Sequence, residues 1–289
     1  MTWLAFALLA AVADGTKDFV SKRTLAASSP YVVSWALFTV AAPLLLVAAA
    51  TTEPPELGPR FIPAVVATCV VYVGAVILYM SALKASDLSL SLPMISFTPA
   101  LLLLTGPLVL GELPPAAGIG GVGVIVLGAY LLNLKDARIG ILEPFRSLAK
   151  ERGPRLMLVV ALLFSVTATT AKVTVQQSSP LWAFATMYSF SAAIFNVYVW
   201  GRRKITVSEL KQSWRAILLI GALVAVAELG VAYGLSLALA VYVVSVKRLS
   251  ILVGVVLGVA FLKERQGATR LLGAAVMIAG ILLITLIPR

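Results

Sequence analysis

Long apolar runs recur along almost the whole chain, and they restrict its fold more than any other feature of the sequence. A helix rises about 1.5 Å per residue, so about 20 apolar residues cross the roughly 30 Å hydrocarbon layer of a membrane. Only 12% of the 289 residues are charged, against about 25% in soluble domains. We therefore predict an all-α membrane protein with ten transmembrane helices. The ten apolar runs are residues 2–21, 31–50, 61–82, 88–110, 115–134, 155–174, 181–200, 214–237, 240–262 and 268–287.

The second half of the chain repeats features of the first half. The segment that begins at Glu112 aligns without a gap to the segment that begins at Glu264, 152 residues later, and SKRTLAASSP aligns with AKVTVQQSSP at an offset of 150. Two matches in the same order, at nearly the same offset, indicate an internal repeat. Each repeat holds five predicted spans, so the second must enter the membrane from the opposite side, and we predict two inverted five-helix repeats. The chain then divides into a first repeat (1–134), a basic connector (135–154) and a second repeat (155–289).

Glycines spaced seven residues apart occur in the fifth and tenth spans, where the two repeats align best. This spacing places them on one face of each helix, and small residues let two membrane helices approach closely. We expect helix packing rather than substrate contact from Gly121, Gly128, Gly273 and Gly280.

The distribution of positive charge predicts how the spans are oriented. Of the 23 Lys and Arg residues, seventeen lie in odd-numbered connectors, whereas three lie in even-numbered connectors or at the C-terminus. Cytoplasmic connectors carry the excess of Lys and Arg, so we place the odd-numbered connectors in the cytoplasm and both termini outside. The net charge of +11 belongs to these connectors and does not indicate nucleic-acid binding. Apolar residues at helical spacing in the connector 135–154 predict an amphipathic helix at the membrane surface.

Six charged residues lie inside predicted spans, where each charge costs at least ~2.5 kcal/mol. Such charges must face protein or water. Three are acidic and three are basic, which favours pairing. The residues on the first span are spaced i, i+3 and i+4 and share one helix face, whereas the two adjacent basic residues of the ninth span are about 100° apart. The six are Asp14, Lys17, Asp18, Glu228, Lys247 and Arg248.

Two interpretations of these charges stay open. In the first, they form structural pairs that hold helices together, although desolvation offsets most of the gain from a buried pair. In the second, they line a cavity in which Lys247 or Arg248 binds a carboxylate or phosphate. Glu228 is the candidate for proton coupling, because a carboxyl group in a low-dielectric site can exchange protons near neutral pH. The alternative is that Glu228 only neutralises a neighbouring basic residue.

Several other polar and aromatic residues carry weaker signals. Of the aromatic residues inside spans, Tyr79 and Tyr233 are candidates to line the cavity, because they fall at comparable places in spans three and eight. Glu112 and Glu264 lie at span ends, where we expect caps or connector salt bridges. We expect interfacial positions for the repeat-matched lysines and a kink in span four from its prolines. These residues are Lys22 with Lys172, and Pro93 with Pro99.

Several short motifs together resemble a known family. They are Gly111-Glu112 and Lys263-Glu264 before the glycine-spaced spans, residues 79–83 at the end of span three, and the pairs Ser29-Pro30 and Ser179-Pro180. This set, which extends over the whole chain, resembles the drug/metabolite transporter superfamily and its ten-helix EamA-like permeases. The resemblance implies two inverted halves around a central cavity that opens to either side. Similar members export amino acids or metabolites, or exchange sugar phosphates and nucleotide sugars.

We therefore expect a secondary active transporter that moves a small polar metabolite, zwitterionic or anionic, by alternating access and without a cofactor. The alternative is a flippase in which the same charges bind the head group of a lipid-linked substrate. An enzyme is disfavoured, because the chain has no His, no Ser-centred motif and no metal-binding cluster, and its single Cys69 lies in an apolar run. Short connectors and the lack of a soluble domain favour a prokaryotic inner membrane.

Overall fold

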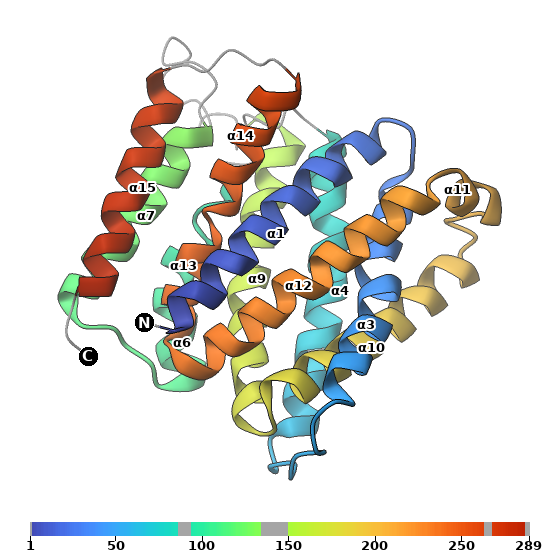
Figure 1. The fold of residues 1–289 in the computed structure, drawn as a ribbon, viewed down its shortest axis with the longest axis horizontal. Helices are drawn as coiled ribbons and strands as arrows, with labels where there is room; N and C mark the ends of the chain where they lie inside the picture. Colours follow the sequence, from blue (N-terminus) through green and yellow to red (C-terminus); the bar gives the residue numbers. More distant parts are fainter. Residues whose placement is uncertain (1, 86–93, 134–149, 263–267, 287–289) are drawn as a thin grey trace.

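The described part of the chain is helical throughout and contains no β-strand. The structure is a computed structural model, and it describes residues 2–85, 94–133, 150–262 and 268–286. Figure 1 shows the helices as a bundle of long, mostly side-by-side elements. They are α1 (Thr2–Leu25), α2 (Pro30–Trp35), the π-helix η1 (Ala36–Val40), α3 (Ala41–Ala49), α4 (Phe61–Ala85), α6 (Thr98–Leu110), α7 (Ala116–Asn133), α9 (Arg152–Gln176), α10 (Pro180–Gly201), α11 (Val207–Gln212), α12 (Trp214–Leu237), α13 (Ala240–Lys247), α14 (Ser250–Leu262) and α15 (Ala268–Leu286).

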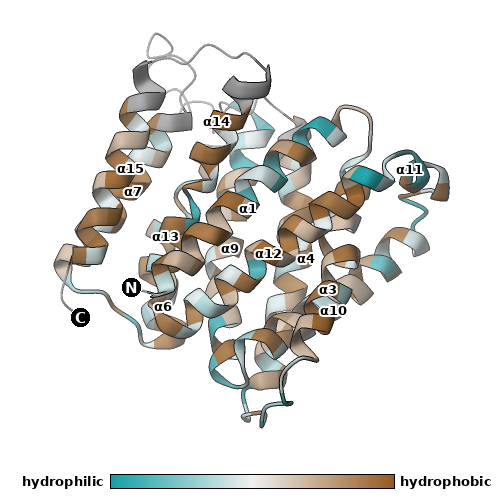
Figure 2. Cartoon of the chain, in the orientation of Figure 1, coloured by the Kyte–Doolittle hydropathy of each residue, from teal (hydrophilic) through white to brown (hydrophobic). Residues whose placement is uncertain are grey.

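Four helical segments among the described residues are long and apolar enough to cross a membrane. Shorter apolar helices and charged or interrupted ones occupy the described parts of the other six predicted spans. Figure 2 shows hydrophobic residues along most of the helices and hydrophilic residues gathered around α11. An integral, multi-pass membrane protein is therefore the architecture that the helices support. The four long segments are Pro30–Ala49, Phe61–Ala82, Arg152–Gln176 and Trp214–Leu237.

The second span is continuous but contains a π-helical turn at η1. Pro43 follows this turn and has no N–H group to donate to Thr39, four residues earlier, which explains a local widening of the helix. At the start of the span, the Ser29 side chain accepts the N–H of Val32, and Pro30 is the first helical residue. The Ser179-Pro180 pair begins α10 in the same way. The two Ser-Pro motifs therefore perform the same local function, which is to cap a helix.

The ninth span is not one continuous helix, which corrects the expectation from its length. The helix α13 ends at Lys247, a turn follows at Arg248 and Leu249, and α14 begins at Ser250. Hydrogen bonds to the residue three positions back replace the α-helical pattern here, for example from the Leu249 N–H to the Val246 carbonyl at 2.9 Å. The break lies where charged side chains need space to reach partners on other helices.

An equivalent break interrupts the fourth span. A turn at Ser96 and Phe97 precedes α6, as the turn at Arg248 and Leu249 precedes α14. The two turns are 152 residues apart, and so are the starts of the two helices. Pro99 near the start of α6 fits a helix N-terminus, because its missing N–H would be unbonded there. The expected kink in span four is therefore a break on the N-terminal side of Pro99. Pro93, Lys263, Glu264 and the predicted amphipathic helix within the connector 135–154 lie outside the described residues.

Helices from the two sequence repeats pack in matched pairs. The first helix of each repeat lies along the third helix of the other, so α1 packs on α12 and α9 packs on α4. The last helices of the two repeats, α7 and α15, pack against each other and lie side by side in Figure 1. Each of these six long helices therefore packs against a helix of the opposite repeat.

The four glycines lie where α7 meets α15. A Cβ atom on Gly128 would lie 2.5 Å from the backbone nitrogen of Met277 and 2.7 Å from the carbonyl oxygen of Gly273. A Cβ atom on Gly280 would lie 2.9 Å from the carbonyl oxygen of Gly121. Backbone atoms cannot move aside as a flexible side chain can, so the close approach of these helices requires glycine.

We predict that Gly128→Ala lowers the apparent melting temperature of the purified protein, because overpacking costs about 1–3 kcal/mol. The matched control is Gly123→Ala on the same helix, where nothing lies within 4 Å of the added atom. That variant should match or exceed the parent, since Ala favours a helix over Gly by about 1 kcal/mol. Equal melting temperatures for the two variants would contradict the proposed contact.

Candidate functional site

The candidate site begins on α1, where three charged residues, Asp14, Lys17 and Asp18, lie within about one turn of the helix. The Lys17 Nζ atom lies 2.8 Å from Asp14 Oδ1 and 2.7 Å from Asp18 Oδ1. The i, i+3 and i+4 spacing seen in the sequence therefore produces a local network with a net charge of −1. Lys17 is shared between two carboxylates, so each of them is only partly neutralised.

Lys247 connects this network to Glu228 of α12. Its Nζ atom lies 3.2 Å from Glu228 Oε1 and 3.8 Å from Asp14 Oδ2. The break after α13 brings the side chain to a position between α1 and α12, which belong to different sequence repeats. Lys247 of the second repeat thus forms an ion pair with Asp14 of the first repeat and links the two halves inside the bundle. We call Asp14, Lys17, Asp18, Glu228, Lys247 and Arg248 the central cluster.

Arg248 differs from the other members of the central cluster because it forms no ion pair with another described residue. Its Nε atom is buried and has no hydrogen-bond partner. Asp14 and Asp18 are close enough to interact with its charge. The charge of the guanidinium group is therefore balanced by its surroundings, but its Nε–H is an unused donor, which suits the group to bind an anion.

The central cluster retains accessible surface although it lies between helices. The accessible fraction of the side chain is 11% for Glu228 and 40% for Asp18. A charged group at membrane depth faces protein or a water-filled cavity. The cluster therefore borders space that water or a small polar molecule can occupy.

Tyrosine hydroxyl groups extend the polar region to α4 and α10. The hydroxyl groups of Tyr72 and Tyr188 are 3.0 Å apart, and both residues interact electrostatically with Glu228. Tyr79, one of the two predicted tyrosines, interacts with Asp18 and Lys17. The site thus draws polar groups from α1, α4, α10, α12 and α13.

Tyr233, the other predicted tyrosine, is placed differently. Its ring stacks on Phe6 of α1, with the ring centroids 5.0 Å apart. This contact is a packing contact between α1 and α12. Comparable positions in spans three and eight therefore do not give Tyr79 and Tyr233 comparable surroundings.

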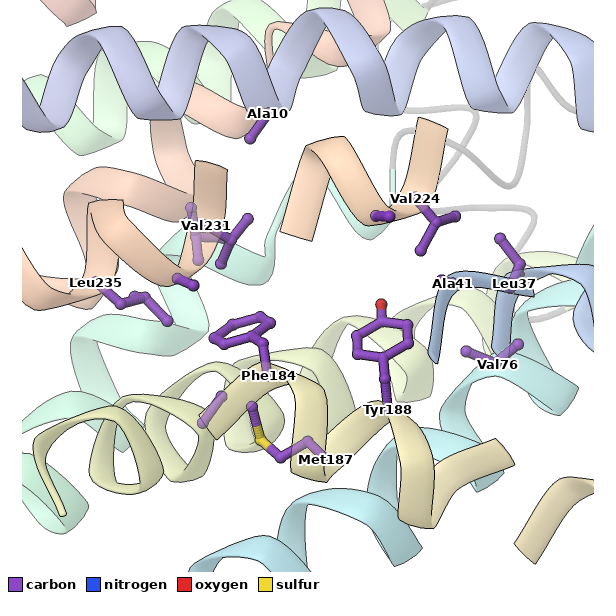
Figure 3. Close-up of a cluster of buried hydrophobic side chains, with 14 of the residues drawn as sticks. Ala10, Leu37, Ala41, Val76, Phe184, Met187, Tyr188, Val224, Val231 and Leu235 are labelled. Carbon is purple, nitrogen blue, oxygen red and sulfur yellow. The ribbon is translucent and has the colours of Figure 1, made fainter. Parts of the chain in front are cut away.

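Apolar side chains form the wall of the site between α10 and α12. In Figure 3, Tyr188 and Phe184 extend from α10 toward α12, where Val224 and Val231 lie. Phe38 packs against both Tyr72 and Tyr188. The tyrosine hydroxyl groups are thus held in place by an apolar frame.

Two recesses open near odd-numbered connectors. One, of about 320 Å³, lies between α2 and α4 and is lined by residues that include Tyr31, Met80 and Arg152. The other, of about 500 Å³, lies between the end of α1 and the start of α12 and includes Arg23 and Arg215. Among the described residues, no three His, Cys, Asp or Glu side chains are grouped so that they could hold a metal ion.

Comparison with known families identifies the chain. The model of the EamA-like transporter family matches residues 1–134 and 152–286. The chain belongs to the EamA-like transporter family. This EamA-like protein is therefore a multi-pass membrane transporter of the drug/metabolite type, and the two matched ranges leave out residues 135–151, which are most of the basic connector.

Structural comparison agrees on the fold of this EamA-like transporter. A solved structure described only as "Crystal structure of protein" aligns with a TM-score of 0.77 and 16% sequence identity, and it covers 99% of this chain and 97% of that chain. At this identity the likeness concerns the fold alone. No curated protein matches the sequence.

Sequence reasoning missed two groups of polar residues in this transporter. Tyr72 and Tyr188 were passed over because aromatic residues in membrane helices usually pack or lie at the interface. Lys172 was expected at the interface, but it is 5% exposed and pairs with Glu112. The signal was available, because Lys172 and Glu112 both have counterparts in the other repeat, as Lys22 and Glu264.

We predict that Lys247→Met destabilises the protein strongly, because removal of one partner from a buried pair costs about 3–5 kcal/mol. The double variant Lys247→Met/Glu228→Gln should recover much of this loss, since Glu228 is then no longer an unpaired charge. The measurement is the apparent melting temperature in detergent. Lys211→Met, at an exposed position on α11, is the control and should have little effect. Additive losses in the double variant would show that the pair is not coupled.

Proposed function

We propose that this transporter is a secondary active transporter that moves a small polar metabolite, zwitterionic or anionic, through the central cluster. The observation that carries the proposal is Arg248, because its buried Nε atom has no hydrogen-bond partner and two carboxylates are close enough to interact with its guanidinium group. An anionic group of the substrate would bind Arg248. Asp18, the most accessible carboxylate of the network on α1, would bind a positive group if the substrate carries one.

We further propose that the transporter works by alternating access between two inverted five-helix repeats. Matched breaks before α6 and α14, and matched packing of α1 on α12 and α9 on α4, support this arrangement. Binding sites of inverted-repeat transporters lie near the midplane, where interrupted helices meet. The charge distribution supports cytoplasmic odd-numbered connectors and external termini in a prokaryotic inner membrane.

The test of the substrate site is a thermal-shift screen of the purified protein against amino acids, nucleotides, sugar phosphates and polyamines. A ligand at 100 times its Kd stabilises the folded state by about 2.7 kcal/mol. We expect a stabilising compound to lose its effect in Arg248→Gln and to keep it in the control Arg202→Gln, at an exposed position after α10. Stabilisation that survives in Arg248→Gln would remove Arg248 from the site. Stabilisation by lipids alone would favour the flippase.

We propose that Glu228 couples transport to protons, because Lys247 is the one ion-pair partner of its carboxylate among the described residues and the Tyr72–Tyr188 pair lies close to it. Protonation of Glu228 would release Lys247 and change the charge of the site. Glu228→Gln should abolish accumulation of the stabilising compound driven by a pH gradient in proteoliposomes but preserve exchange of that compound at equal concentrations. The control Glu56→Gln, on the surface between α3 and α4, should keep both activities. Accumulation by Glu228→Gln would rule out this role.

A further inference from the structure

A second buried ion pair lies away from the central cluster, at the side of the even-numbered connectors. Glu112, in the connector between α6 and α7, pairs with Lys172 of α9. Its other carboxylate oxygen accepts the backbone N–H of Ala240 at 3.1 Å. Lys172 also donates to the carbonyl oxygen of Ala238 at 2.6 Å. We call these four residues the Lys172 cluster.

The Lys172 cluster connects the two sequence repeats. Glu112 belongs to the first repeat, whereas the other three residues belong to the second. Ala240 begins α13, so the Glu112 carboxylate also lies at the positive end of that helix. Lys247 follows seven residues later on α13, roughly 10 Å further along the helix. In Figure 1, the α6–α7 and α12–α13 connections lie near the lower edge of the bundle. The Lys172 cluster therefore lies at the start of α13, on the side of the even-numbered connectors, whereas Lys247 of the central cluster lies at the end of the same helix.

The lysine that matches Lys172 in the first repeat differs from it in burial and pairing. Lys22 aligns with Lys172 in the sequence repeat. It is exposed, and it pairs with no carboxylate among the described residues. The counterpart of Glu112 is Glu264, which lies outside the described residues. One lysine of a repeat-matched pair is thus buried and paired, and the other is open to solvent.

Other links between the repeats do not show this asymmetry. The Gly58 N–H donates to the Gln177 carbonyl at 2.8 Å on the side of the even-numbered connectors. The hydroxyl groups of Ser28 and Ser213 are 2.8 Å apart on the side of the odd-numbered connectors. Peripheral links therefore join the repeats on both sides. The Lys172–Glu112 ion pair, which lies at the start of α13, has no equivalent on the other side within the described part of the chain.

We propose that the Lys172 cluster is the gate that closes the transport path on the side of the even-numbered connectors, and that it opens when the two repeats move relative to each other. The inference rests on the alternating-access function proposed above. A buried pair adds little net stability, but it is lost as a unit when α9 and the α6–α7 connector separate. This behaviour suits a gate that must be either closed or open.

The test measures access to a cysteine beneath the gate and requires no substrate. Ser245 of α13 is fully buried between Ala240 and Lys247, and Ser245→Cys is introduced after the native thiol is removed by Cys69→Ala. A membrane-impermeant maleimide is added to sealed vesicles from the side of the even-numbered connectors, which Glu53→Cys in a parallel protein identifies. We expect slow labelling of the parent and labelling faster by on the order of tenfold in Lys172→Glu, a shift that corresponds to about 1.4 kcal/mol.

Two further variants separate a gate from general loosening. The charge swap Lys172→Glu/Glu112→Lys restores an ion pair and should return labelling toward the parent rate. Gln177→Ala removes a different link between the repeats, in which the Arg60 N–H donates to the Gln177 Oε1 atom at 3.1 Å, and it should not accelerate labelling. Unchanged labelling in Lys172→Glu, no rescue by the swap, or equal acceleration by Gln177→Ala would each overturn the proposal. A failed ligand screen would leave the labelling result intact, so the two proposals fail separately.

Discussion

The interaction on which the rest of the site depends is the placement of Lys247 between Glu228 and Asp14. A charged side chain inside a membrane protein needs a partner or water, since an unpaired charge at that depth is costly. Lys247 satisfies this requirement with one carboxylate from α12 and one from α1. This contact holds the first helix of one repeat, the third helix of the other and the break after α13 in one arrangement.

The break after α13 has a structural cost and a structural benefit. Backbone hydrogen bonds shift to a tighter pattern at Arg248 and Leu249, which weakens the helix locally. In return, two adjacent basic residues, which a regular helix would place about 100° apart, lie at a turn from which each meets different partners. Lys247 is used in pairing, whereas Arg248 retains a buried Nε atom without a partner. The break after α13 therefore provides one cation that is paired, Lys247, and one cation with an unused hydrogen-bond donor, Arg248.

Packing between the repeats explains why two ion-pair systems can have different roles. The helices α7 and α15 meet backbone to backbone at their glycines, which leaves no room for sliding at that contact. Each of the polar contacts described in the central cluster and the Lys172 cluster involves at least one charged side chain, which can part from its partner and pair with it again. A close glycine contact at the periphery, together with polar contacts between side chains in the interior, fits the alternating access that we propose. In the proposed mechanism, the glycine contact between α7 and α15 stays the same while the ion pairs break and form.

The sequence by itself determined the membrane-embedded helical class, the repeat and the six intramembrane charges, because hydropathy, residue spacing and the cost of buried charge are local properties. It also marked the Ser-Pro helix starts. Only the tertiary structure decided which charges meet, since pairing depends on how helices far apart in sequence pack. The sequence could not separate Tyr79, near the charges, from Tyr233, stacked on Phe6. The sequence could not reveal that Lys172 is buried, because a lysine at the end of a span is expected at the membrane interface. Its partner Glu112 comes from the opposite repeat, and only the tertiary structure brings the two together.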